Sequence, residues 1–240
     1  MAFQEGDIVR VDYTVKRDGE VFETTREEVA VKEGIFDEKR KYAPAIAIIG
    51  EQNFFEKVDN ELRGMDVGQK RVVKLEPKDA FGERKPELIR MVALKEFKRR
   101  NIVPFPGLVV DLNGLQGRVQ SVSGGRVRVD FNHPLAGKAI EFELEVVEKV
   151  DGKERKAQAL IERYLSFAKD EAKVSFENDC LIVEGSAEKL LGSDALRSNF
   201  AKSALKCLPV KKVKFVEVFD KEFLDKQKET EQKAKENAEE

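Results

Sequence analysis

The sequence has 240 residues, which is enough for one or two domains. Apolar residues make up 41% and charged residues 38%, so the chain can bury a core while its faces stay strongly solvated. The net charge of −2 gives no overall field toward nucleic acid or membrane, and two cysteines exclude a disulfide framework. The N-terminus has no leader-like pattern and no apolar run is long enough to cross a bilayer, so we expect a cytoplasmic protein.

The N-terminal part predicts a β-hairpin followed by a short helix. Residues 8–15 alternate between apolar and polar side chains, as one strand of a half-buried sheet does. The dipeptide Asp18-Gly19 then predicts a turn, and the strand resumes at residues 21–22. Helical spacing over residues 54–63 predicts a helix that ends at Gly64.

Two further strands are predicted on either side of a segment of different composition. The strands are residues 71–75 and residues 140–146, and the second has a clear apolar–acidic alternation. Between them, residues 83–128 carry ten Lys and Arg against four acidic residues, a local charge of +6, together with many apolar side chains. Gly124-Gly125 lies between two apolar runs and predicts a second hairpin. We interpret this segment as a small β-rich unit inserted into the first domain.

The C-terminal part predicts an α-β-β-α-β unit of about seventy residues. Apolar residues recur at helical spacing from Ala157 to Ala168, and a second helix is predicted over residues 195–208. Two short strands, residues 173–176 and 180–184, lie between the helices, and a last strand follows Pro209. From residue 225 the only apolar side chains are two alanines, so the end of the chain is predicted to be a charged tail without a core.

Residues for acid–base, nucleophilic, metal or nucleotide chemistry are scarce. The single histidine, His133, precedes a proline and is predicted to be a hydrogen-bonded turn residue rather than a general base. No CxxC, HExxH, glycine-rich dinucleotide motif or phosphate-binding loop occurs, so we expect no metal and no cofactor. These absences argue against most hydrolases, transferases and dehydrogenases.

Rotation about an X–Pro bond is an activity that needs no titrating group. Amide resonance sets its barrier at roughly 18–20 kcal/mol, and the transition state is a twisted amide that has lost this resonance. An apolar aromatic pocket favours that state by excluding the water that stabilises the planar amide. Sixteen phenylalanines are compatible with such a pocket.

Several motifs of this sequence resemble those of the FKBP family. Residues 19–25 read Gly-Glu-Val-Phe-Glu-Thr-Thr, residues 44–50 resemble the segment that enters the active-site turn, and residues 79–82 read Asp-Ala-Phe-Gly. The most specific motif is residues 131–138, Phe-Asn-His-Pro-Leu-Ala-Gly-Lys, which is similar to the motif of the SlyD-like branch with an insert in the flap. The resemblance covers residues 1–150, and long archaeal-type members also carry a C-terminal domain.

The resemblance and the segment patterns together predict an α+β fold. An antiparallel β-sheet wrapped on a short helix is expected over residues 1–83 and 134–150. A small β-rich inserted chaperone domain is expected at 84–133, a C-terminal α/β sandwich-like domain at 151–222, and the charged tail at 223–240.

The resemblance also implies a catalytic pocket and an activity. Its members are peptidyl-prolyl cis-trans isomerases, with Glu23 as the pocket carboxylate here and the Phe55 amide as the donor to the carbonyl that precedes proline. The residues expected to form the pocket are Tyr13, Phe22, Glu23, Phe54, Phe55, Val58, Phe81 and Phe142.

Some positions depart from the family pattern and leave a second hypothesis open. Glu23 replaces the usual aspartate, Lys57 stands where a glycine is common, and Ala45 stands where many members have an aromatic wall. Two adjacent phenylalanines, Phe54 and Phe55, occupy the active-site turn. The alternative is therefore a non-catalytic chaperone or binding module on a degenerate FKBP scaffold.

The apolar and basic insert predicts a folding helper that holds unfolded or nascent polypeptides. We further consider a homodimer formed through the C-terminal domain and contact of the basic insert with the ribosome, and we expect neither membrane nor specific nucleic-acid binding. The insert residues expected to contact clients are Leu88, Ile89, Met91, Val92, Phe97 and Phe105.

Overall fold

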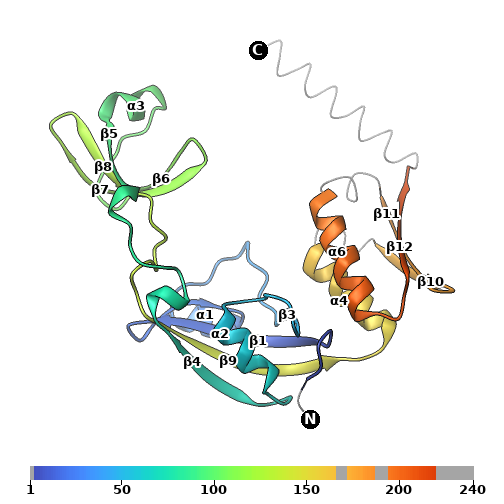
Figure 1. Ribbon diagram of the computed structural model, residues 1–240. Helices are drawn as coiled ribbons and strands as arrows, with labels where there is room; N and C mark the ends of the chain where they lie inside the picture. The colour runs from blue at the N-terminus through green and yellow to red at the C-terminus, as the bar shows by residue number, and fades with distance from the viewer. Residues whose placement is uncertain (1–2, 166–171, 187–193, 220–240) are drawn as a thin grey trace. The chain divides into compact units, whose positions relative to one another are not determined.

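The computed structural model describes residues 3–165, 172–186 and 194–219 (Figure 1). The helices among these residues are short, and most of the secondary structure is strand. The strands are β1 (Ile8–Arg17), β2 (Glu20–Thr24), β3 (Ala45–Ile48), β4 (Lys70–Leu75), β5 (Ile89–Ala93), β6 (Val109–Leu112), β7 (Leu115–Ser123), β8 (Arg126–Asp130), β9 (Ile140–Val150), β10 (Lys173–Glu177), β11 (Cys180–Ser186) and β12 (Lys212–Val218). The helices are α1 (Glu27–Lys32), α2 (Glu56–Arg63), α3 (Leu94–Arg99), α4 (Lys153–Tyr164) and α6 (Asp194–Cys207), with 3-10 turns η1 (Pro77–Asp79) and η2 (Pro86–Leu88).

The strands form three sheets, which confirms the predicted α+β class with antiparallel sheets. The first sheet has five strands in the order β2-β1-β9-β4, with β3 paired to β1. The second has the order β5-β8-β7-β6, and the third has the order β10-β11-β12. Pairing is antiparallel in β1–β3, β5–β8, β6–β7, β7–β8 and β10–β11, whereas β11 and β12 run parallel.

The chain divides into two compact units. The first unit contains Met1–Tyr13, Thr24–Arg71 and Leu144–Glu240, and the second contains Thr14–Glu23 and Val72–Glu143. The insert sheet therefore belongs to the second unit, and the C-terminal elements belong to the first.

A single apolar cluster in the first unit joins the N-terminal strands to the C-terminal helices. Ile8 of β1 pairs with Ile48 of β3, and both are fully buried. They pack in one core with Leu160 of α4 and Phe200 of α6, which are also fully buried. Burial of this many apolar side chains is the main stabilising contribution, at roughly 25 cal/mol per Å² of apolar surface removed from water.

The insert sheet has its own small core in the second unit. Alternation along β8 directs Val127 and Val129 to one face, where they pack around Phe97 of α3. Gly117 on β7 leaves room for this packing, because a Cβ there would lie 2.7 Å from Val129 and from Phe131. The insert core therefore lies on the face of the sheet that contains Val127 and Val129.

Turn residues set the hairpins that the sequence predicts. Gly124 and Gly125 both adopt positive φ, 55° and 73°, as a two-residue hairpin turn between β7 and β8 requires. Asp18 and Gly19 do the same between β1 and β2, with φ of 52° and 84°. Both predicted hairpins are therefore confirmed.

The C-terminal elements that the structure describes lie in the order α4, β10, β11, α6 and β12. α4 begins at Lys153, four residues before the apolar pattern that predicted it, and the end of that pattern at Ala168 lies outside the described residues. The charged tail predicted at 223–240 also lies outside them. Two short helices, α1 and α3, were not predicted. Within the described ranges, no helix combines the length and apolar character needed to cross a bilayer.

Candidate active site

An aromatic pair in the first unit provides the clearest apolar surface among the predicted site residues. The rings of Tyr13 on β1 and Phe54 before α2 lie with centroids 5.5 Å apart in an edge-to-face arrangement of 71°. Both side chains are half-buried, so part of each ring stays exposed. Edge-to-face pairs are worth about 0.5–1.5 kcal/mol beyond their burial, so this pair fixes the orientation of both rings.

The turn that carries Phe54 is ordered by the side chain of Asn53. Its Oδ1 accepts a hydrogen bond from the Ile48 amide at 2.8 Å, and its Nδ2 donates to the carbonyls of Ile48 and Glu51, each at 2.9 Å. One side chain thereby satisfies three backbone groups of the 48–53 segment, whose polar atoms need partners when they are buried.

Asp59 holds the same turn from the other side. Its carboxylate accepts hydrogen bonds from the amides of Asn53, at 3.1 Å, and Phe54, at 3.2 Å. Asp59 lies in the first turn of α2, where a negative charge is favoured by the helix dipole. The backbone that leads into α2 is therefore fixed by two polar side chains that the sequence analysis did not single out.

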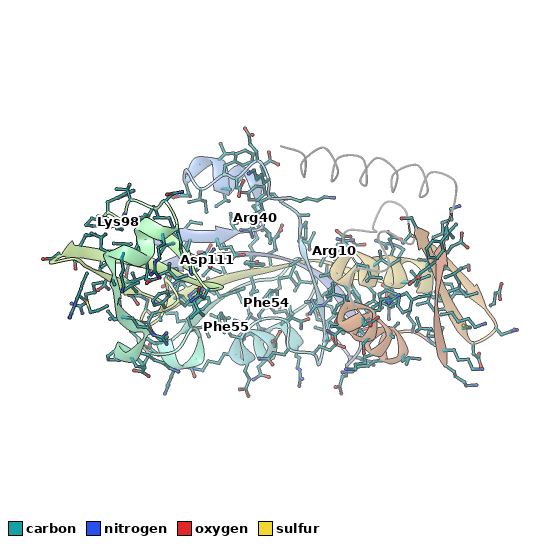
Figure 2. All side chains as sticks on the ribbon, turned by 90° about the horizontal axis from the view of Figure 1, so that it is seen from above. Arg10, Arg40, Phe54, Phe55, Lys98 and Asp111 are labelled. Atoms are coloured by element: carbon teal, nitrogen blue, oxygen red, sulfur yellow. The ribbon has the colours of Figure 1, made fainter. Side chains whose placement is uncertain are left out.

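Phe55 and Val58 complete the predicted residues of the first unit. Phe55 is the residue before α2 and has an extended conformation, with φ −84° and ψ 149° (Figure 2). Phe55 thus lies at the N-terminal end of α2, and the role of its amide as donor to the substrate carbonyl stays a prediction. Val58 is fully buried on α2 together with Leu62, so it acts as a core residue that supports the helix.

The other four predicted residues belong to the second unit. Phe22 on β2 is 40% exposed, whereas Phe142 on β9 is buried, and Glu23 is half-buried. The ring of Phe81 stacks on His133, with centroids 4.0 Å apart and nearly parallel planes.

His133 itself has the structural role that the sequence predicted. Its Nδ1 accepts a hydrogen bond from the amide of Leu135 at 3.2 Å. Burial lowers the pKa of His133 below its usual value, so the stacked imidazole is neutral at pH 7. The eight predicted residues thus divide evenly between the two units, and their closure into one pocket stays a prediction.

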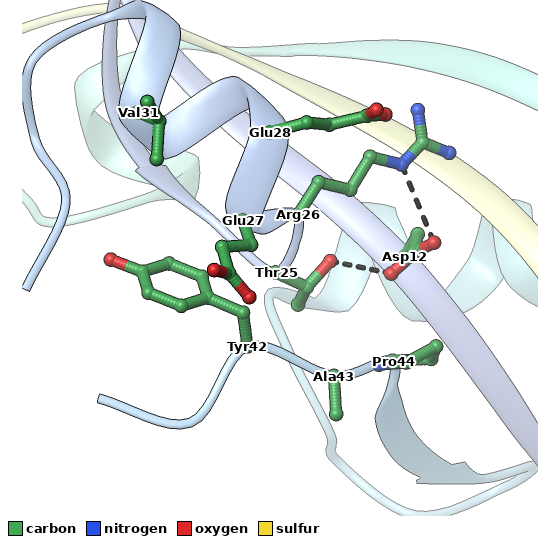
Figure 3. A pocket seen from close by; sticks show the side chains of 9 residues that line it. All are labelled: Asp12, Thr25, Arg26, Glu27, Glu28, Val31, Tyr42, Ala43 and Pro44. Atoms are coloured by element: carbon green, nitrogen blue, oxygen red, sulfur yellow. Dashed lines mark hydrogen bonds and ion pairs between the residues drawn. The ribbon is translucent and has the colours of Figure 1, made fainter. Parts of the chain in front are cut away.

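A polar hollow of about 750 Å³ lies elsewhere in the first unit, beside α1 (Figure 3). Figure 3 shows the carboxylate of Asp12 accepting hydrogen bonds from Thr25, at 2.8 Å, and from Arg26, at 3.3 Å. Arg26 also pairs with Glu145. None of the eight predicted site residues lines this hollow. The bonds from Thr25 and Arg26 to Asp12 join the start of α1 to β1.

The C-terminal helices contact the segment that leads into the active-site turn. The Glu51 carboxylate accepts hydrogen bonds from Ser203 of α6, at 2.9 Å, and from Tyr164 of α4, at 3.1 Å. Nearby, Arg163 donates to the carbonyl of Ile46. Arg10, which is labelled in Figure 2, pairs with Glu162 at 2.9 Å. α4 and α6 therefore hold residues 46–51 in place, a role that no local sequence pattern indicated.

Cys207 at the end of α6 is a buried, free thiol. Burial, together with the negative charge of Glu51, raises the pKa of the Cys207 thiol to about 11, so the group is protonated at neutral pH. Cys180 is also buried and free of a disulfide. In the part of the chain that the structure describes, no group of three or more His, Cys, Asp and Glu side chains is arranged to hold a metal ion.

The predicted client-binding residues of the insert do not share one environment. Met91 and Phe105 are each 57% exposed, and Leu88, Ile89 and Val92 are half-buried. Phe97 is fully buried at the centre of the insert core, so its prediction as a client contact is wrong. Phe97 and the other apolar residues at alternate positions form the insert's own core, which composition alone could not distinguish from an exposed surface.

Comparison with known proteins agrees with this arrangement. A family model for FKBP-type peptidyl-prolyl cis-trans isomerases matches residues 1–98, and a model described as the IF domain of FKBP26 matches residues 90–135. The short-type peptidyl-prolyl cis-trans isomerase of Methanocaldococcus jannaschii is 33% identical over 143 residues, which cover 60% of this chain and 91% of the relative. The FKBP-type 16 kDa isomerase of Escherichia coli is 31% identical over 150 residues, covering 60% and 92%.

A more distant relative carries the name of the branch that the flap motif indicated. The FKBP-type isomerase SlyD of Vibrio cholerae is 28% identical over 124 residues, covering 50% of this chain and 62% of the relative. The family model matches this chain, and the alignments with the first two relatives cover more than nine tenths of each relative. These matches agree with the sequence motifs and with the antiparallel sheets. The chain belongs to the family of FKBP-type peptidyl-prolyl cis-trans isomerases.

Proposed function

We propose that the chain catalyses cis–trans isomerisation of X–Pro bonds in unfolded polypeptides. The observation that carries this proposal is the Tyr13–Phe54 pair, mounted on a turn that Asn53 and Asp59 hold. A rigid, partly exposed aromatic surface beside a helix N-terminus suits a proline ring with a neighbouring carbonyl. No proton needs to move, which agrees with the neutral, stacked His133.

The chemistry follows from the barrier. Twisting the amide removes the resonance that makes the planar form polar, so an apolar environment destabilises the planar form more than the twisted one. The aromatic side chains would exclude water. The Phe55 amide N–H would donate a hydrogen bond to the substrate carbonyl and orient the peptide. Glu23 would supply the pocket carboxylate.

A protease-free assay on a series of short X–Pro peptides tests the activity. Phe55→Ala should reduce kcat/KM because it removes an apolar wall, and Glu23→Asp tests the reach of the carboxylate. As a matched control, Phe105→Ala changes an exposed phenylalanine of the insert and should leave kcat/KM on short peptides unchanged. Equal loss in the two phenylalanine variants would place the chemistry outside the predicted pocket.

We further propose that the insert holds unfolded or nascent clients while the isomerase portion acts on them. Its exposed apolar side chains support this role, with Val103 at 81% and Phe105 and Met91 at 57%. Exposed apolar side chains gathered in one small unit are typical of interaction sites. Val103→Ser with Phe105→Ser should weaken suppression of aggregation of a denatured client. Unchanged suppression, or unchanged suppression after removal of residues 84–133, would contradict the proposal.

The alternative function is a chaperone without useful isomerase activity. The observation that favours it is Val58, which is fully buried and offers a proline ring no surface of its own. Absence of catalysis in the parent, with gain of catalysis in Glu23→Asp, would support this alternative. A faster proline-limited refolding phase in the presence of the parent would exclude it.

Self-association and place of action remain further proposals. The edge strand β12 exposes Val216 and Val218, and unpaired strand edges are common dimer surfaces, so we propose a homodimer through the C-terminal part. A monomer mass that does not change with concentration would exclude it. We also propose that the protein acts in the cytoplasm. Contact of the basic insert with the ribosome is a separate proposal, which co-sedimentation with ribosomes tests.

A further inference from the structure

The insert sheet has one face that its core does not cover. α3 and Phe97 pack on the face that contains Val127 and Val129. Strand alternation directs Arg126 and Arg128 of β8 to the opposite face, and both side chains are exposed. We call this second surface the open face of the insert.

The strand register aligns three arginines on the open face. Arg128 pairs with Ser121, after a bulge in β7. Arg118 pairs with Asp130 and lies between Gly117 and Val119, whose side of the strand faces the core, so Arg118 faces the open side. Arg126 follows in the next row, paired with Ser123. We name Arg118, Arg126 and Arg128 the arginine ladder. On β8 the two arginines are two residues apart, which is about 6.6–6.8 Å along a strand.

The acidic residues near the ladder are already engaged by other groups. Asp130 pairs with Arg84 and accepts hydrogen bonds from Gln120 and Asn132, while Asp111 accepts one from the Gly114 amide. Among the described residues, no carboxylate forms an ion pair with any of the three ladder arginines. Asp130 is the cross-strand partner of Arg118 and Asp111 shares this face, but the Asp130 charge is offset by Arg84, so the open face keeps a net positive charge.

Apolar side chains border the ladder, and a hollow adjoins it. Met91 is the cross-strand neighbour of Arg128, and Val109 is that of Arg118; both are more than half exposed. A hollow of about 550 Å³ begins at Arg118 and Val109 and is also lined by Phe22. The open face thus continues, within the second unit, to a residue predicted to belong to the catalytic pocket.

We infer that the open face binds extended client segments that carry carboxylates at alternate positions beside apolar residues. An extended peptide directs every second side chain to one side, about 6.6–6.8 Å apart, which equals the spacing of the ladder arginines on β8. Guanidinium groups bind carboxylates through paired hydrogen bonds. Met91 and Val109 supply the apolar contacts. This inference rests on the proposed client-holding function of the insert.

The composition of the open face favours a peptide over nucleic acid. Single-stranded nucleic acid is usually bound by aromatic side chains on which bases stack. The residues that the register pairs directly with the ladder arginines are aliphatic, hydroxyl or carboxylate side chains, and none is aromatic: Met91, Ala93, Val109, Ser121, Ser123 and Asp130. Phe22 lies at the adjoining hollow. An acidic, apolar polypeptide fits this combination of charge and shape.

The test is fluorescence anisotropy of the full chain with three labelled peptides. They share an apolar core with one proline and carry Glu, Gln or Lys at alternate positions. The parent should bind the Glu peptide about tenfold more tightly than the Gln peptide, which three exposed ion pairs can supply. The triple variant Arg118→Gln, Arg126→Gln, Arg128→Gln should lose this preference and keep the affinity for the Gln peptide.

A matched triple variant separates a local site from net charge. Lys95→Gln, Lys98→Gln, Arg99→Gln removes the same charge from α3, which covers the other face of the sheet, and should keep the Glu preference. A variant with lysine at all three ladder positions keeps the positive charge. It should show part of the Glu preference that the glutamine variant loses, which separates loss of charge from loss of folding.

Three outcomes would overturn the inference. If both glutamine variants lose the Glu preference equally, net charge explains it and no local site is needed. If the parent shows no Glu preference, the open face does not select acidic segments. Tighter binding of single-stranded RNA than of the Glu peptide, lost in the ladder variant, would make nucleic acid the occupant. Failure of the proposed function is distinct, because the Gln peptide would then not bind and aggregation would not be suppressed.

Discussion

Replacing Asn53 by alanine should unfold the active-site turn while leaving the rest of the sheet intact. Asn53 has a half-buried side chain whose amide bridges three backbone groups of the 48–53 segment. Alanine keeps the backbone and removes all three bonds. Because Phe54 and Phe55 follow directly, the perturbation acts on the surface proposed for catalysis without touching an aromatic ring.

The expected magnitude follows from the bonds that are lost. Ile48 is fully buried, and its amide would lose its acceptor, which costs about 1–3 kcal/mol for a buried unsatisfied group. The Ile48 carbonyl keeps a bond from the Glu51 amide, and the Asp59 carboxylate keeps its bonds from the Asn53 and Phe54 amides after losing the one from Asn53 Nδ2. The lost bond to the Glu51 carbonyl adds about 0.5–1.5 kcal/mol. The free energy of unfolding should therefore fall by about 1.5–4.5 kcal/mol, a large share of a typical stability.

Urea unfolding and peptide kinetics measure the two consequences. We expect a lower midpoint with an unchanged slope, and kcat/KM on short X–Pro peptides lower by about 10–100-fold, because misplaced groups lose catalytic geometry. Asn60→Ala on the exposed face of α2 is the matched control and should change stability by less than about 0.5 kcal/mol. An Asn53→Ala variant as stable and active as this control would refute the role assigned to the turn.

Three further predictions concern buried groups. Burial raises the pKa of Asp7, but hydrogen bonds from Lys149 and the Gln4 amide outweigh it and leave the pKa below the usual value. Asp7 should therefore stabilise the fold above the unfolded pKa of about 3.9, and urea midpoints of the parent and Asp7→Asn should converge as pH falls below it. Cys207, with a pKa of about 11, should resist iodoacetamide at about pH 8 in the folded chain and react in urea; labelling of the folded chain would contradict its burial. Phe97→Ala should cost about 3–5 kcal/mol and abolish client holding while short-peptide isomerisation persists; retained holding would show that the insert core tolerates the cavity.

Local signals predicted the elements that depend on local chemistry. Gly124-Gly125 specified a hairpin because both residues must adopt positive φ, and Gly64 marked the end of α2. α2 begins at Glu56, two residues later than predicted, because Phe54 and Phe55 are held extended ahead of it. The six-residue helices α1 and α3 were missed, since one and a half turns give too few positions for a helical period to stand out from alternation.

The candidate site was predictable only in part. The aromatic residues match family motifs, whereas no motif indicates Asn53 and Asp59. Neither is the N-cap of α2, and both bond the backbone of the turn ahead of the helix. Glu51 bonds Tyr164 and Ser203, which lie 113 and 152 residues away in the sequence. Local hydrophobic periodicity carries no information about contacts between such distant residues. Phe97 was misassigned because an apolar residue in a small unit can serve either its core or its surface.

The core shared by β1, β3, α4 and α6 constrains how this chain can be shortened. A chain terminated after Val150 would leave Ile8, Ile46 and Ile48 facing water instead of Leu160 and its neighbours. Three bared isoleucines along β1 and the edge strand β3 would be a nucleus for aggregation. The isomerase portion of this chain is therefore not a free-standing module, and grafting it onto another protein would require polar replacements at these three positions.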